Sequence, residues 1–326
     1  MSYLIAGFVG GLLLVYCVIR ASINIRLLAV PNARSFHRVP TPTAGGLGFV
    51  IPVLGFVALV AAQGVVAAQG LFAGGVLLTL VSLWDDYREV PAAVRFACQV
   101  VAVVIGLWGL QLPWHMVLVS LVGLALLWHV NLFNFMDGID GIAGVQCMVF
   151  CFGALLLSEG IPGWTGDVVW LLMGTVLAFL VYNWPSAKIF MGDVGSAFLG
   201  LLLGLLVVDL WQTDRLPLVA SLILLAGFWF DATYTLCVRM LTGQPFTQAH
   251  RSHLYQQIAE RKGHLWTTVA FLLFGLCWLI PLAWLALTYP GLGYLVLAVA
   301  VVPLALLAVR CQAGVRRNLM DDDQFE

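Results

Sequence analysis

The chain has 326 residues, of which 62% are hydrophobic and only 10% are charged, and its mean hydropathy is +1.01. A water-soluble domain carries about a quarter charged residues, so this composition excludes a soluble protein and indicates a polytopic membrane protein. The net charge of −1 is uninformative by itself, but the absence of a Lys and Arg block outside short loops argues against nucleic acid as a partner. The seven cysteines form no Cys-x-x-Cys pair, so neither a zinc site nor a disulfide framework is expected.

Apolar stretches long enough to cross a bilayer recur along the whole chain. We count about eleven, at 3–23, 44–62, 70–84, 93–110, 114–133, 143–159, 167–183, 196–211, 216–238, 266–287 and 291–310. The expected fold is therefore an all-α polytopic integral membrane protein with about eleven transmembrane helices. We expect a single domain over 1–326, with a cytoplasmic histidine loop at 239–265 and a cytoplasmic tail at 311–326.

The basic residues indicate the orientation. Almost every Lys and Arg falls in alternate loops, and only Arg215 falls in the other set. The positive-inside rule then places the N-terminus outside and the C-terminus in the cytoplasm. Polar clusters follow the third, fifth, seventh and ninth stretches, so all four emerge on the cytoplasmic face, where they could form one active site.

The segment that enters the second stretch contains His37 and Arg38, followed by two prolines and the pair Gly45 and Gly46. The prolines fix an extended entry and the glycines permit close helix contact, which is a sufficient structural explanation for most of the segment. His37 and Arg38 could add positive charge to the site.

Asp85 and Asp86 end the third stretch. Adjacent carboxylates repel each other, and a divalent cation or a neighbouring base relieves the repulsion. The simpler alternative is a solvated helix end paired with Arg88.

Asn131, Asn134, Asp137 and Asp140 stand three residues apart, a spacing that places side chains on one face of a helix. A glycine follows each aspartate and indicates that the helix opens into a turn. Acids and amides at the end of a membrane helix are costly unless they bind something. This stretch is therefore the expected centre of the site.

The segment from Lys188 to Ser196 precedes the eighth stretch. Its glycines permit a turn whose backbone N–H groups face an anion, and Ser196 is expected to cap the helix. Asp193 would hold a metal ion, while the helix start would meet phosphate oxygens. An ordinary connecting turn is the alternative.

Asp231 lies within the ninth stretch and is a functional candidate, with pairing to Arg239 as the alternative. His250, Arg251 and His253 lie in the long loop and suit phosphate contacts better than magnesium, which takes oxygen ligands. The isolated histidines, His264 among them, are expected at interfaces.

Together these motifs resemble the polyprenyl-phosphate N-acetylhexosamine-1-phosphate transferases, which begin cell-envelope glycan synthesis. The resemblance covers nearly the whole chain and rests on five motifs in the family's order. They are Pro-Thr-Pro-x-x-Gly-Gly at 40–46, Asp-Asp at 85–86, Asn-Phe-Met-Asp-Gly-Ile-Asp-Gly at 134–141, Phe-Met-Gly-Asp-Val-Gly-Ser at 190–196 and His-Arg-Ser-His at 250–253.

The resemblance implies that sugar 1-phosphate passes from a UDP-N-acetylhexosamine to undecaprenyl phosphate, with release of UMP and with Mg²⁺ or Mn²⁺, in the bacterial inner membrane. The N-terminus would then be periplasmic. The histidine run resembles that of the O-antigen-initiating branch, whose donors are UDP-GlcNAc or a 6-deoxy-N-acetylhexosamine. Its short loop argues against a MurNAc-pentapeptide donor. The donor sugar and a homodimer remain open.

The roles that follow fall into three groups. The expected catalytic residues are Asp85, Asp86, Asp137, Asp140, His250 and His253. The expected substrate-binding residues are His37, Arg38, Asn131, Asn134, Asn183, Lys188, Phe190, Gly192, Ser196, Asp231 and Arg251. The expected metal ligands are Asp193 and Asp86.

Joining two phosphates requires that the site neutralise both anions. A phosphate monoester has a second pKa near ~6 and is mostly dianionic at neutral pH, so direct in-line attack by the lipid phosphate is expected. Asp85 would orient the acceptor or remove a residual proton, and a covalent aspartyl-phosphate is the alternative. A transporter would place its polar groups at the membrane midplane, and a noncatalytic lipid-glycan scaffold would not need the carboxylates.

Overall fold

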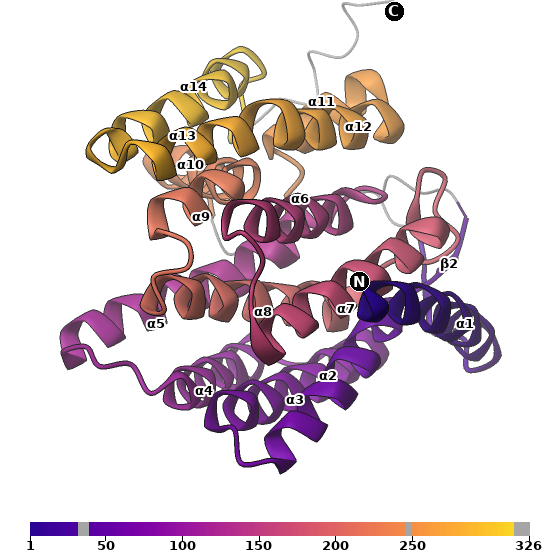
Figure 1. The fold of residues 1–326 in the computed structure, drawn as a ribbon. Coiled ribbons are helices and arrows are strands. Elements are labelled where there is room, and N and C mark those ends of the chain that lie inside the picture. The colour runs from indigo at the N-terminus through magenta and orange to yellow at the C-terminus, as the bar shows by residue number, and fades with distance from the viewer. Residues whose placement is uncertain (32–38, 246–249, 316–326) are drawn as a thin grey trace, which may run out of the picture.

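The computed structural model describes residues 1–31, 39–245 and 250–315, which are almost entirely helical (Figure 1). The first helices are α1 (Ser2–Asn24), α2 (Leu47–Ala62), α3 (Val66–Tyr87), α4 (Ala92–Leu110), α5 (Met116–Met136), α6 (Ile142–Leu157), α7 (Gly163–Asn183) and α8 (Gly192–Gln212). They are followed by α9 (Leu218–Leu224), α10 (Ala226–Leu241), α11 (Leu254–Lys262), α12 (His264–Phe274), a π-helical turn η1 (Gly275–Leu279), α13 (Ile280–Thr288), a 3-10 turn η2 (Pro290–Leu292) and α14 (Gly293–Arg310). The short strands β1 (Leu28–Ala29) and β2 (Thr41–Pro42) pair antiparallel, with Leu28 opposite Pro42.

Each of the predicted apolar stretches forms a helix or a helix pair. Within the described residues, eight helical stretches are long and apolar enough to cross a membrane, and a ninth is added if α9 and α10, bent by 78°, count as one span. The helices α2 and α6 have 16 residues each. At ~1.5 Å per residue, such a helix is shorter than a hydrocarbon core of ~30 Å. The structure therefore supports a multi-pass all-α membrane protein with eight or nine clear spans, and the full count of eleven stays a prediction.

Among the eight long spans of the described residues, α8 is the most enclosed, with 89% of its apolar segment buried inside the protein. A helix that is apolar on every side is buried on every side, and the Leu and Gly residues of α8 fit this rule. It packs against α3 and α5, while α7 packs against α1. Figure 1 shows α8 in the middle of the molecule, with α2 to α4 on one side and α10 to α14 on the other.

The start of α2 lies directly against the start of α8. The backbone N–H of Gly45 donates to the carbonyl of Phe190, and that of Gly46 to the carbonyl of Met191, both at 2.9 Å. A Cβ atom at Gly46 would overlap the backbone of Gly195. The predicted close contact at Gly45 and Gly46 is therefore confirmed, and it brings the chain before α2 to the region where α8 begins.

Candidate active site

A cavity of about 380 Å³ lies where α5 ends and where α8, α11 and α12 begin. The residues that line it come from five separate segments of the chain. They are Thr43, Asp86, Asn134, Asp137, Gly138, Ile139, Asp140, Asn183, Phe190, Met191, Gly192, Asp193, Ser196, His250, Arg251, Gln256 and His264. The structure thus brings together members of every described polar cluster that the sequence singled out.

The carboxylate of Asp193 is held by a side chain of α5. The side-chain amide of Asn134 on α5 donates to Asp193 Oδ1 at 2.8 Å and contacts Ser196 Oγ at 3.2 Å. The prediction that Ser196 caps α8 is wrong, because α8 already begins at Gly192 and Ser196 bonds back to the carbonyl of Gly192. The N-terminus of α8 is instead capped by Asp86 of α3.

Asp86 occupies the N-terminus of α8. Its carboxylate accepts the backbone N–H groups of Asp193 at 3.1 Å and Val194 at 3.4 Å, where the positive end of the helix dipole favours an anion. Gly192 has φ +75°, and a Cβ atom there would lie 2.7 Å from Asp86 Oδ2. Asp86 therefore binds two of the backbone N–H groups at the helix start that was predicted to meet phosphate oxygens, and the phosphate contact stays a prediction.

Asp85 is paired outside the lining of the cavity. Arg95 Nη1 lies 2.5 Å from Asp85 Oδ2 and 3.4 Å from Asp193 Oδ2, and the backbone N–H of Val90 donates to Asp85 at 2.8 Å. The neighbouring base of the aspartate pair is Arg95, and not the Arg88 of the simpler alternative. One indication of this pairing was present in the sequence. Arg95 lies in the first turn of α4, where the helix dipole disfavours a cation unless an acidic partner is near.

The spacing of three along Asn131 to Asp140 predicted one shared face, and the structure confirms this only in part. The helix ends at Met136, so Asp137 and Asp140 follow it in a turn and line the cavity with Asn134. Asn131 instead donates to Gln99 Oε1 on α4 at 2.9 Å. It lies outside the cavity lining.

Asp140 is held by two segments, the loop after α7 and the start of α12. Its Oδ2 accepts the backbone N–H of Ala187 at 3.1 Å and lies 3.4 Å from His264 Nδ1, while Thr268 Oγ1 donates to its carbonyl at 2.7 Å. Asn183 holds the same turn, because its Oδ1 accepts the N–H of Gly141 at 2.9 Å. The loop therefore presents its acids on a rigid support.

Negative charge accumulates in this cavity. Burial raises the pKa of Asp137 well above its usual range, and the nearby carboxylates of Asp193, Asp140 and Asp86 raise it further. These carboxylates repel one another, so they can all be ionised only when a positive charge lies among them. A bound cation would supply it.

The oxygen donors of the cavity are of the kind that magnesium and manganese ions take. Among the residues that the structure describes, no group of three or more His, Cys, Asp or Glu side chains forms a ready-made metal site. Magnesium is usually held by one or two carboxylates plus waters and substrate phosphates. Asp193 and Asp86, both in the cavity lining, provide carboxylates of this kind.

Asp231 lies away from the cavity and anchors α11. Its buried carboxylate accepts the backbone N–H groups of Leu254 at 2.8 Å and Tyr255 at 2.9 Å, and His253 Nδ1 lies 3.4 Å away. The alternative pairing with Arg239 is wrong, because that guanidinium bonds the oxygens of Gln244 and Pro245. Asp231 and His253 thus hold the helix that carries Gln256 to the cavity.

His250 and Arg251 both line the cavity, the first as a neutral ring and the second as a cation. Burial and the positive charges of His253 and Arg239 lower the pKa of His250 to about 3, so its ring is neutral at pH 7. Arg251 is 3.6 Å from Glu260 and supplies the cationic group. Lys188, predicted to contact phosphate, is exposed and lies outside the lining.

Sequence reasoning missed four residues of the site. Thr43, Gln256 and His264 line the cavity, and Arg95 contacts Asp193 from α4. His264 was expected at an interface, and its isolation at the start of a span gave no signal for the Asp140 contact. His37 and Arg38 lie outside the described residues.

The fold and the cavity define a multi-pass membrane protein with an acidic site at the ends of its helices. The family model described as glycosyl transferase family 4 matches residues 68–211, which include the motifs from Asp85 to Ser196. The chain is similar to this family over that segment, which is less than half of its length.

Curated relatives extend the match beyond these residues. A probable undecaprenyl-phosphate N-acetylglucosaminyl 1-phosphate transferase of Bacillus subtilis is 28% identical over 79% of this chain and 78% of its own length. A decaprenyl-phosphate N-acetylglucosaminephosphotransferase of Mycobacterium leprae is 27% identical, over 77% and 74%. A phospho-N-acetylmuramoyl-pentapeptide-transferase of Thermotoga neapolitana is 30% identical, over 53% and 61%.

Proposed function

We propose that this protein transfers N-acetylhexosamine 1-phosphate from a UDP-N-acetylhexosamine to undecaprenyl phosphate and releases UMP. The observation that carries the proposal is the shared cavity of Asp86, Asp137, Asp140 and Asp193, with Arg251 beside them, at the ends of membrane helices. The names of the Bacillus subtilis and Mycobacterium leprae relatives support a polyprenyl phosphate as acceptor. In this reaction an oxygen of the lipid phosphate attacks the β-phosphorus of the donor, and the bond from that phosphorus to the UMP oxygen breaks.

The acidic residues of the cavity and its basic residues have different roles in this proposal. Asp193 and Asp86 would hold a Mg²⁺ or Mn²⁺ ion, which when bound would neutralise the diphosphate and the departing UMP. Arg251 would bind a further phosphate oxygen through its guanidinium, and the neutral His250 would contribute a hydrogen bond. Both lie in the lining of the same cavity as the acids of the α5 turn.

Asp85 acts indirectly in this scheme. A phosphate monoester is mostly dianionic at neutral pH, so the acceptor needs no strong base. Because Asp85 is paired with Arg95, and Arg95 reaches Asp193, the pair is assigned to positioning Asp193. This replaces the expectation that Asp85 orients the acceptor itself.

The lipid acceptor accounts for the location of the site. Its phosphate lies at the membrane interface and its tail stays in hydrocarbon, so a cavity between helix ends spares the acceptor full extraction from the bilayer. We place this cavity on the cytoplasmic side of the bacterial inner membrane, where UDP-sugars are made, with the N-terminus periplasmic. The distribution of Lys and Arg supports this orientation.

For the donor we propose UDP-GlcNAc or a 6-deoxy-N-acetylhexosamine nucleotide, in the initiation of O-antigen synthesis. The short run from His250 to His253 supports this choice over a MurNAc-pentapeptide donor. The names of the Bacillus subtilis and Mycobacterium leprae relatives also contain N-acetylglucosamine.

The proposal is tested by incubating the purified chain with undecaprenyl phosphate, Mg²⁺ and a panel of UDP-sugars, and measuring UMP. We expect UMP release that requires the lipid phosphate and a UDP-N-acetylhexosamine, with UDP-MurNAc-pentapeptide inert. Release of no UMP from any donor would contradict a transferase and favour a noncatalytic lipid-glycan scaffold or a transporter.

A further inference from the structure

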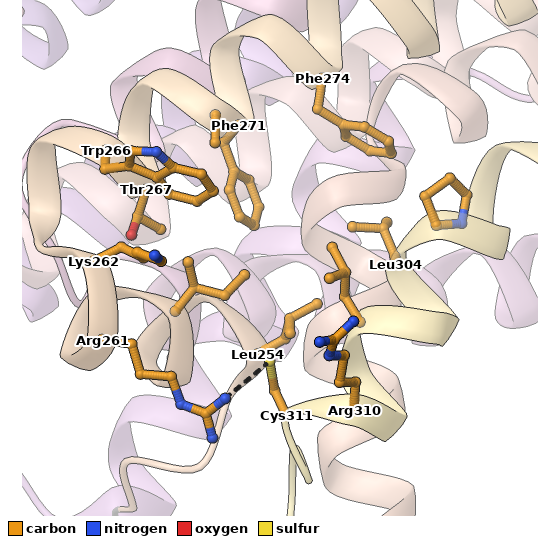
Figure 2. A pocket seen from close by; sticks show the side chains of 14 residues that line it. Leu254, Arg261, Lys262, Trp266, Thr267, Phe271, Phe274, Leu304, Arg310 and Cys311 are labelled. Carbon is orange, nitrogen blue, oxygen red and sulfur yellow. Dashed lines mark hydrogen bonds between the residues drawn. The ribbon is translucent and has the colours of Figure 1, made fainter.

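A second cavity of about 380 Å³ lies between α11, α12 and α14, and Figure 2 shows its side chains. Most of its walls are apolar. They include Leu254 and Ile258 of α11, Phe271 and Phe274 of α12, and Leu304 and Leu307 of α14. The proposed reaction does not use this cavity, which we call the apolar slot.

Three cations border one end of the apolar slot. Arg261 and Lys262 stand in the last turn of α11, and Arg310 is the last residue of α14. Arg261 Nη1 lies 4.0 Å from Cys311 Sγ, and none of the three cations forms an ion pair with any residue that the structure describes. A molecule with an anionic group and a hydrocarbon chain would match this cavity, because the anionic group would contact the three cations and the chain would contact the apolar walls.

The cations stand at the same end of two membrane spans. The span that contains α12 begins at His264, just after Lys262, and the span that contains α14 ends at Arg310. From Trp266 to Phe274 the wall of the slot runs along α12 for roughly 12 Å, at ~1.5 Å per residue. The slot therefore leads from a basic membrane surface into the hydrocarbon region, the geometry of a phosphate with acyl chains below it.

The slot and the acidic cavity lie on opposite sides of α11. Leu254 and Ile258, four residues apart, share the face toward the slot, whereas Gln256 points about half a turn away and lines the acidic cavity. A phosphate at Arg261 would have α11 between it and the carboxylates. The occupant of the slot is therefore not the reacting acceptor.

We propose that the apolar slot binds an anionic diacyl phospholipid, with its phosphate at Arg261, Lys262 and Arg310 and an acyl chain between α12 and α14. Basic pockets between membrane helices on the cytoplasmic side bind such headgroups. The bound lipid would brace α11, whose Tyr255 hydroxyl donates to the carbonyl of Phe135 at 2.9 Å, next to Asn134 of the acidic cavity. This inference holds whatever reaction the acidic cavity performs.

The test measures lipid retained by the delipidated full chain after titration with phosphatidylglycerol or phosphatidylcholine, using mass spectrometry of the intact protein. We expect preferential retention of phosphatidylglycerol, which falls by about fivefold for each cation removed in Lys262→Gln and Arg310→Gln. Arg215→Gln removes an exposed cation in the other set of loops and should leave retention unchanged. Ala270→Phe should abolish retention by filling the slot while keeping all three charges.

Each variant is first checked for an unchanged thermal unfolding temperature in detergent, and only variants that pass this check are compared. Equal retention of the two lipids, or full retention by both Lys262→Gln and Ala270→Phe, would overturn the proposal. So would displacement of phosphatidylglycerol by undecaprenyl phosphate at equal concentration, because the slot would then be an acceptor site. Retention seen only after truncation at Val315 would assign the slot to residues 316–326 instead.

Discussion

Asp193 is the residue on which the contacts of the acidic cavity converge. Asn134 donates to one of its carboxylate oxygens, Arg95 approaches the other, and its backbone N–H is bound by Asp86. Three elements, α3, α4 and α5, thus fix the direction of one carboxylate on α8. Positioning of this kind matters because a misplacement of about 1 Å can cost roughly 10²-fold in rate.

If Asp85 acts through Arg95, the two residues are coupled. We expect Asp85→Asn and Arg95→Gln each to lower kcat/KM for UMP release, and the double variant to be no worse than the more impaired single variant. The double-mutant cycle should give a coupling of about 1 kcal/mol or more. Additive losses would show that Asp85 has a separate role, such as contact with the acceptor.

The charge of His250 gives a pH prediction. Its pKa is lowered to about 3, chiefly by burial and then by the positive charges of His253 and Arg239, so the folded protein binds this proton less well than the unfolded chain, with a histidine pKa near ~6.5. Protonation of His250 therefore costs stability progressively as the pH falls below ~6.5.

In the substrate-free protein, we expect the His250 NMR resonance, assigned with His250→Gln, to show no titration between pH 5 and 8. Binding of a nucleotide diphosphate should move its titration upward. A midpoint near ~6.5 without substrate would contradict the neutral ring.

At the scale of elements, the start of α8 depends on Gly192. With φ +75° and a Cβ position 2.7 Å from Asp86 Oδ2, Gly192→Ala would carry both backbone strain and a clash with the carboxylate that caps α8. Gly64 has φ +88° with nothing within 4 Å of its Cβ position, so Gly64→Ala carries the strain alone.

We expect Gly64→Ala to cost about 1 kcal/mol in stability and to keep its activity. Gly192→Ala should be less stable still and should lose most UMP release, as measured by thermal unfolding and steady-state assay. Equal behaviour of the two variants would mean that the Asp86 cap does not matter to the site.

The ends of helices were the part of the site that the sequence could not supply. A spacing of three predicts a shared face only while the helix continues, and α5 stops at Met136, so Asn131 turns toward Gln99 while Asp140 reaches Ala187. The role of Asp231 was hidden for a related reason. Its partners are backbone N–H groups at the start of α11, and backbone donors have no residue type to recognise in a sequence.

At the scale of the whole molecule, the order of the apolar stretches gave the most useful prediction, that the polar clusters lie together. Acids that follow alternate apolar stretches must emerge on one face of the membrane, and Asp86, Asp137 and Asp193 do share one cavity. Residues such as Arg95 and His264 could not be found in this way, because their contacts depend on how helices pack rather than on the order of spans.

The orientation is tested by labelling single cysteines, in a background without the native cysteines, with a membrane-impermeant maleimide. Lys188 and Arg215 are both exposed, and they precede and follow the buried helix α8. With the acidic cavity facing the cytoplasm, Arg215→Cys should react in intact spheroplasts and Lys188→Cys only after permeabilisation. The reverse pattern would place the cavity outside.

The most direct measurement of the central claim compares two aspartates on α8. Asp193 lies in the acidic cavity, whereas Asp209 lies near the other end of the same helix, where it accepts from Thr165. In the UMP-release assay we predict that Asp193→Asn loses roughly 10²-fold or more of the rate while Asp209→Asn stays near the unmodified protein. Near-normal release by a folded Asp193→Asn protein would contradict the account, because the transfer would then proceed without the carboxylate around which the cavity is built.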